Sequence, residues 1–188
     1  IKSVIQEIKD VKIKKLLANK KDLLEELFTS SSYNNLRNLR QTTLDFARFY
    51  DYLPESSKAK ERLMEHLMSL FFSISFEIKK GQIIEEDINK LFNVELFLRK
   101  PDQKKERSKE QIMRSKYSVF SKFDHPIANT FWIDFFKKGI IEKEDLKLSI
   151  ESSSYYDDEK TPDWVRLCHF RGLDDQEFDR LFKIVDHQ

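Results

Sequence analysis

Apolar side chains recur every three or four residues along most of the chain, which is the spacing of one face of an α-helix. Residues 1–29 carry two such stripes, separated by the polar stretch 19–22. The next helix is predicted to run to Leu53, because Pro54 cannot continue it. Its apolar stripe is Leu36, Leu39, Thr43, Phe46, Tyr50 and Leu53. A stripe this narrow predicts packing against a partner helix.

The segment 57–80 is the most apolar part of the chain. Apolar residues on nearly all sides predict a helix in the middle of a bundle. Residues 72–78 alternate between apolar and polar and could also form a strand, but helical spacing begins well upstream, which favours the helix. Gly81 follows two lysines and is predicted to be the left-handed cap of this helix. Gly139 stands after the same Lys-Lys pair and predicts a second helix end.

The segment 99–116 contrasts with its surroundings, with eight Lys or Arg residues against three Asp or Glu. It is interpreted as a charged linker between two helical bundles. The predicted organisation is therefore all-α, with a lid-like subdomain at 1–98, the linker at 99–116 and a C-terminal helical subdomain at 117–188. The C-terminal subdomain is expected to build its core from Phe120, Phe123, Phe131, Trp132, Phe135, Phe136, Leu146, Trp164, Leu167, Phe170, Phe178, Leu181 and Phe182.

Charge and composition narrow the class of protein. The 188 residues carry a net charge of +1, so no overall field attracts the chain to nucleic acid or membrane. The 16 Phe residues argue against a disordered chain. Cys168 is the single cysteine, which excludes a disulfide within the chain and favours a cytoplasmic protein. The apolar runs are short, so no membrane span is expected.

Residues for independent catalysis are missing from the pattern. Three glycines, widely spaced, cannot form a glycine-rich phosphate loop. No pair among the four histidines has metal-binding helical spacing, so no metal site is predicted. Cys168 and His169 are adjacent and would point about 100° apart on a helix, which disfavours a nucleophile–base pair. We expect no catalytic site within this chain.

An anion site is predicted at the start of the helix that follows residue 35. Asn34 and Asn35 are candidate caps, and Arg37 and Arg40 lie one turn apart beside the apolar stripe. Free backbone N–H groups and two guanidinium groups would together hold a phosphate. The alternative is ordinary surface arginines whose stems cover apolar area.

A second set of candidate contacts lies in the basic linker. Lys104, Lys105, Arg107 and Lys109 could touch the phosphate backbone of a nucleic acid. The segment has no interleaved aromatic residues for base stacking, so a solvated linker is the favoured interpretation.

The sequences DLLEELF at 22–28 and YNNLRNLRQ at 33–41, followed by Phe46, resemble the helical lid that follows the nucleotide core in AAA+/KAP-like P-loop ATPases. Segments 76–83 and 162–170 look like C-terminal helical regions of large bacterial ATPases in this group. In such lids an N-x-R helix start supplies a sensor-2 arginine, which reaches the terminal phosphates of the nucleotide.

The resemblance implies that Arg37 contacts phosphate, with Arg40 as the substitute. It also implies ATP and Mg²⁺ bound by a P-loop core outside this chain, since that core is the part of the family missing here. Ile1 opens an apolar pattern without a cap, which supports interpreting the chain as a fragment. Several members of the family serve anti-phage defence, and that role is expected with it.

The favoured function is therefore a lid plus a C-terminal regulatory or assembly region of a larger P-loop ATPase. Bound nucleotide would hold the lid through Arg37, and hydrolysis would release it. The expected partners are the rest of the same polypeptide and further copies of it, with no membrane. The alternatives are a stand-alone helical protein-interaction module and a helical nucleic-acid-binding domain that uses the basic linker.

Overall fold

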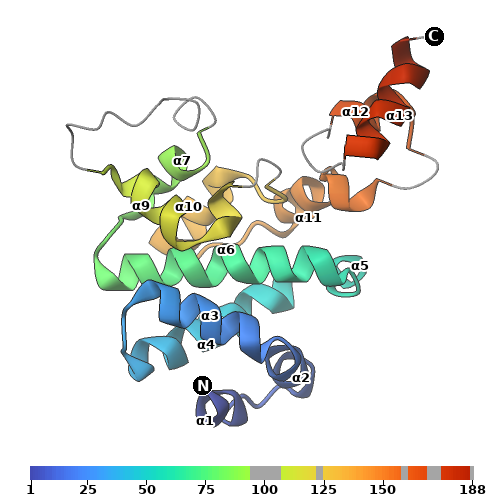
Figure 1. The fold of residues 1–188 in the computed structure, drawn as a ribbon. Helices are drawn as coiled ribbons and strands as arrows, with labels where there is room; N and C mark the ends of the chain where they lie inside the picture. Colours follow the sequence, from blue (N-terminus) through green and yellow to red (C-terminus); the bar gives the residue numbers. More distant parts are fainter. Residues whose placement is uncertain (94–106, 122–124, 158–160, 169–174, 187–188) are drawn as a thin grey trace.

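The computed structural model describes residues 1–93, 107–121, 125–157, 161–168 and 175–186. These residues form α-helices and short 3₁₀ segments, with no β-strand among them, so the predicted all-α class is confirmed (Figure 1). The α-helices are α1 (Lys2–Gln6), α2 (Val11–Asn19), α3 (Lys21–Ser31), α4 (Leu36–Tyr52), α5 (Glu55–Lys58), α6 (Glu61–Lys80), α7 (Ile88–Leu91), α9 (Lys109–Lys116), α10 (Asn129–Lys138), α11 (Lys143–Glu151), α12 (Asp163–Cys168) and α13 (Asp175–Asp186). The 3₁₀ segments are η1 (Glu85–Asp87), η2 (Ser118–Ser121) and η3 (Ser154–Tyr156).

Helix α4 begins and ends close to where the sequence predicts. It ends at Tyr52, two residues before Pro54. Five of the six predicted stripe residues are buried, while Leu36 is 60% exposed. Leu36 is the first residue of α4 and lies outside the part of the helix that packs against the core.

Helix α6 crosses the middle of the molecule, with α3 and α4 on one side and α9 and α10 on the other (Figure 1). Its side chains are buried on nearly all sides, and it is helical throughout 72–78, so the strand alternative is wrong. Gly81 ends α6 with φ +75° and Gly139 ends α10 with φ +69°. Both glycines are the predicted left-handed caps, a backbone conformation that costs other residues energy.

Aromatic side chains from distant parts of the chain form the centre of the core. Phe49 of α4 lies 5.5 Å from Trp132 of α10 between ring centroids. Phe71 of α6 lies 5.4 Å from Phe135 and 5.5 Å from Phe136, also between centroids. Such pairs contribute about 0.5–1.5 kcal/mol each beyond their burial. The buried residues from Val4 to Ile150 form one cluster, so the division into two separate bundles is not confirmed.

Helix α9 occupies the C-terminal half of the segment that the sequence analysis interprets as a linker. Ser108 caps it by accepting a hydrogen bond from the N–H of Gln111, whose side chain accepts one from the N–H of Ser108 in return. Met113 is fully buried in the core. Residues 107–116 are therefore an ordered part of the fold, while residues 99–106 lie outside the described residues.

Helices α12 and α13 form a C-terminal hairpin in which the two helices make their main contacts with each other. Figure 1 shows this hairpin beyond α11. Leu181 is buried inside it, but Trp164 and Phe182 are exposed. The prediction that Trp164 and Phe182 belong to the core is therefore wrong. The described part of the hairpin is too small to enclose all of its large apolar side chains.

Candidate functional site

The start of α4 is capped by Asn35. Its side-chain oxygen accepts hydrogen bonds from the backbone N–H groups of Arg37 (3.1 Å) and Asn38 (3.2 Å). Asn34 is exposed and does not cap the helix. The cap already satisfies two of the amide groups that the predicted anion site would use, so less of the helix start remains for a phosphate.

The two arginines of the predicted anion site have different surroundings. Arg40 forms an ion pair with Glu7 just after α1, at 2.6 Å between Nε and Oε2. Arg37 is exposed, and no residue that the structure describes forms a hydrogen bond or ion pair with its guanidinium group. A phosphate would have to compete with Glu7 for Arg40, whereas Arg37 is available. The predicted phosphate contact therefore narrows to Arg37 and stays a prediction.

The basic residues predicted to contact nucleic acid are only partly within the described chain. Lys104 and Lys105 lie outside it, and Arg107 is exposed. Lys109 forms an ion pair with Asp87 at 2.7 Å. Burial opposes ionisation of Asp87, but hydrogen bonds from Lys109 and from a backbone N–H outweigh it and lower the pKa of this carboxyl. The ion pair of Lys109 therefore links α9 to η1, so this lysine is not a free cation for a nucleic acid to contact.

The C-terminal hairpin presents large apolar side chains to solvent. Trp164 on α12 is 60% exposed and Phe182 on α13 is 51% exposed. The rings of Phe178 and Phe182 stack with centroids 6.0 Å apart. Sequence reasoning missed this surface, although the recurrence of apolar residues at 178, 181, 182 and 185 gives α13 a clear apolar face.

A charged network fixes the two helices of the hairpin to each other. Arg166 of α12 donates a hydrogen bond to Glu177 of α13 at 2.6 Å. Arg180 donates two more to the same carboxylate, each at 2.8 Å. Hydrogen bonds from Arg180 are the main cause that lowers the pKa of Glu177 to about 2, followed by the charges of both arginines. The carboxylate is therefore ionised at neutral pH and links α12 to α13.

The hairpin and the N-terminal helices carry opposite charge. The described residues of the hairpin include five acidic and three basic side chains, and Asp175, Asp179 and Asp186 are exposed. Residues 1–21 contain seven lysines and two acidic residues. Val11, at the start of α2, is 77% exposed, and the charged side chains around it are Lys9, Lys12 and Lys58 together with Asp10, Asp51 and Glu55. The molecule thus has an acidic surface with exposed apolar side chains at the hairpin and exposed lysines, among them Lys2, Lys9, Lys12 and Lys15, on its N-terminal helices and the loop between them.

Two polar groups inside the core have structural partners. Glu77 is fully buried, and it accepts hydrogen bonds from the Tyr117 hydroxyl (2.7 Å) and from Lys116 (3.0 Å). His66 is buried as well, and its Nδ1 shares a hydrogen bond of 2.7 Å with the Tyr155 hydroxyl. The ring of His125 lies 5.9 Å from that of His66 between centroids. These side chains join layers of the fold, and none of them lines the cavity between α4, α6 and α10 or the pockets beside α11 and α2.

The described residues contain no group of three or more His, Cys, Asp or Glu placed to hold a metal ion. Cys168 is exposed on α12. No helix within the described ranges is both long and apolar enough to cross a bilayer.

No known protein family, curated protein or solved structure matches this chain. Two features of the chain's own geometry are exposed and could contact a partner: the apolar surface of the hairpin and the unpaired guanidinium group of Arg37.

Proposed function

We propose that this chain is a helical protein-interaction module that assembles with further copies of itself through the α12–α13 hairpin. The observation that carries this proposal is the exposure of Trp164 and Phe182 on one small hairpin. Large apolar side chains that gather on a surface are typical of sites where another protein binds, and tryptophan is among the residues that contribute most to such binding.

Charge complementarity supports a second copy as the partner. The acidic side chains around the hairpin suit a lysine-rich segment, and residues 1–21 offer one, in which Lys2, Lys9, Lys12 and Lys15 are exposed. A contact between two different surfaces of the same chain is head-to-tail, so it forms rings or open chains of subunits. Such a contact weakens as salt screens the charges.

Sedimentation velocity over a wide range of protein concentration tests this proposal. We expect the wild-type chain to associate as its concentration rises, and a variant with Trp164→Ser and Phe182→Ser to remain monomeric. A variant with Lys12→Glu and Lys15→Glu should also lose association, because it removes the basic partner surface. The matched control is Leu148→Ser on α11, where the leucine is 65% exposed and lies outside the proposed contact.

Two results would contradict the proposal. The first is a wild-type chain that sediments as a monomer at every concentration. The second is a hairpin variant that associates as the wild type does while its circular dichroism shows an intact fold.

A second candidate function is a phosphate-sensing lid in a longer P-loop ATPase, in which ATP and Mg²⁺ are held by the core. The observation that favours it is the unpaired, exposed guanidinium of Arg37 at a capped helix start.

The test of this second function requires a longer polypeptide that contains such a core. Arg37→Ala should then lower ATP hydrolysis about tenfold or more, because a charge-assisted contact contributes roughly 1.5–3 kcal/mol. Arg40→Ala is the matched control, since Glu7 holds that side chain, and equal effects of the two variants would refute the assignment. The anti-phage setting rests on the family resemblance alone.

A further inference from the structure

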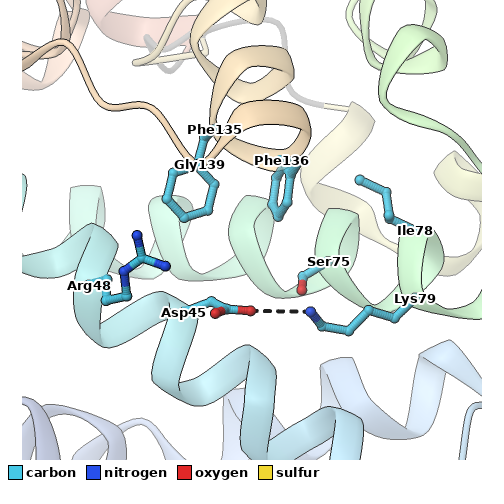
Figure 2. A pocket seen from close by; sticks show the side chains of 8 residues that line it. All are labelled: Asp45, Arg48, Ser75, Ile78, Lys79, Phe135, Phe136 and Gly139. Atoms are coloured by element: carbon cyan, nitrogen blue, oxygen red, sulfur yellow. Dashed lines mark hydrogen bonds and ion pairs between the residues drawn. The ribbon is translucent and has the colours of Figure 1, made fainter.

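A cavity of about 230 Å³ lies between α4, α6 and the C-terminal end of α10. Figure 2 shows Phe135 and Phe136 above it, Arg48 at one end, Lys79 toward the other, and Asp45 between the two basic side chains. The lining comes from three separate helices and spans residues 45 to 139 of the sequence. The cavity is therefore a product of the tertiary fold and not of one local turn.

The charges around the cavity are unequal. Asp45 forms an ion pair with Lys79, at 3.2 Å between Oδ2 and Nζ, and also accepts a hydrogen bond of 2.9 Å from Gln41. The hydroxyl of Ser75 is engaged with that of Thr42 at 3.0 Å.

Arg48 is the remaining charged group of the lining. Within the described chain, no side chain or backbone group forms a hydrogen bond or ion pair with its guanidinium. The cavity thus presents one uncompensated positive charge to an occupant.

We propose that this cavity binds a small molecule with an aromatic or branched apolar body and a single carboxylate group. The guanidinium group of Arg48 presents two parallel N–H donors, which match the two oxygens of a carboxylate. Phe135, Phe136 and Ile78 would cover the apolar body. The volume is sufficient, because an engineered apolar cavity of about 150 Å³ already holds benzene.

A monovalent carboxylate fits this lining better than a phosphate does. A phosphate dianion would need a second cation, and the nearest one, Lys79, is already paired with Asp45. Asp45 would also repel the additional negative charge. A cationic ligand is disfavoured as well, because the lining carries two basic groups against one acidic group. This inference does not depend on the assembly proposed for the hairpin.

Trp132 provides a reporter for binding. Its ring stacks on that of Phe136 with centroids 6.2 Å apart, so an occupant that touches Phe136 changes its surroundings. Trp164→Phe leaves Trp132 as the single tryptophan of the chain. In this variant, Trp132 fluorescence is titrated with phenylacetate, with its neutral isostere phenylacetamide and with inorganic phosphate.

We expect a saturable change with phenylacetate and binding of phenylacetamide that is about tenfold weaker or more, since the charge-assisted hydrogen bonds are lost. Arg48→Met, which keeps the apolar stem, should weaken phenylacetate binding by a similar factor. Arg62→Met is the matched control, because Arg62 is an exposed arginine on α6 and lies outside the cavity lining. It should leave binding unchanged.

Each contrary result overturns the proposal. One is the absence of a saturable signal with phenylacetate. Others are equal binding of acid and amide, binding of phosphate as tight as that of phenylacetate, and retention of full affinity by Arg48→Met. Because Arg48 is exposed, its substitution should not unfold the chain, and circular dichroism checks this.

Discussion

The hydrogen bond between Tyr117 and Glu77 offers the clearest test of how the core is held together. Glu77 on α6 is a fully buried carboxylate, and the Tyr117 hydroxyl donates to it at 2.7 Å. Burial is the main cause that raises the pKa of Tyr117, and the hydrogen bond to Glu77 adds to it, so the phenol stays protonated and keeps its donor. Tyr117→Phe removes that donor and leaves the ring and its packing in place.

The expected loss follows from the partners that remain. Without the phenol, Glu77 keeps only the hydrogen bond from Lys116, at 3.0 Å, because its Oε2 has no hydrogen-bond partner within the described chain. A hydrogen bond to a buried charged group contributes about 1.5–3 kcal/mol. We therefore expect the free energy of unfolding to fall by about 2 kcal/mol. For a chain of this length, that corresponds to a decrease in Tm of roughly 4–8 °C.

Urea unfolding followed by circular dichroism measures this change. The matched control is Tyr52→Phe, because Tyr52 is exposed and no described residue forms a hydrogen bond with its hydroxyl; its stability should change by less than about 0.5 kcal/mol. In a Glu77→Gln background the amide is neutral, so Tyr117→Phe should cost only about 1 kcal/mol. An equal cost in both backgrounds would refute the reasoning, since the charge of Glu77 would then play no part.

Two further predictions concern the packing of α9 and the response to acid. Met113→Ala should lower the free energy of unfolding by about 3 kcal/mol because Met113 is fully buried. Ser115→Ala, on the exposed side of α9, is the control. A loss below about 0.5 kcal/mol for Met113→Ala would instead indicate a solvated linker. Burial, together with the charge of Arg114, lowers the pKa of His125 to about 4 from 6.5. Between these pH values the unfolded chain binds a proton that the folded chain does not, so stability is present above pH 6.5 and is lost as the pH falls toward 4. From about pH 7 to about pH 5, the free energy of unfolding measured with urea should fall by about 2 kcal/mol through this group. His125→Phe should remove that part of the pH dependence. An unchanged dependence of stability on pH in this variant would contradict the prediction.

The elements that sequence reasoning located well have strong local signals. The long apolar run of α6 and the glycine that ends it are sufficient to place the central helix. The stripe of α4 is equally clear, and Pro54 marks its end. In both helices the residues that specify the element lie next to each other in the sequence, so periodicity alone identifies them.

Contacts between distant segments are the features that sequence patterns do not indicate. Met113 is the buried residue of α9 and anchors the helix to the core, but it stands among charged residues that suggest solvent. Trp164 has the composition of a core residue, yet its exposure depends on what the rest of the chain can cover. Arg40 is paired with Glu7, thirty-three residues earlier, and no local pattern indicates that pairing. Burial and charge pairing are tertiary properties, so these residues could not be assigned from spacing.

Arg37 and Arg48 illustrate why a charged residue alone does not define a site. They are eleven residues apart on α4, which places them about three turns apart on the same face of the helix. Water surrounds an exposed guanidinium group and weakens any ion pair that it forms. At Arg37 the described chain provides nothing to exclude that water, so a strong contact with phosphate requires polypeptide from elsewhere. Arg48 is exposed as well, but Phe135 and Phe136 stand beside it as apolar walls from within this chain, so an occupant of the cavity would exclude part of that water. The two arginines therefore make separable predictions: an isolated chain should bind a carboxylate at Arg48 and should show no phosphate binding that depends on Arg37.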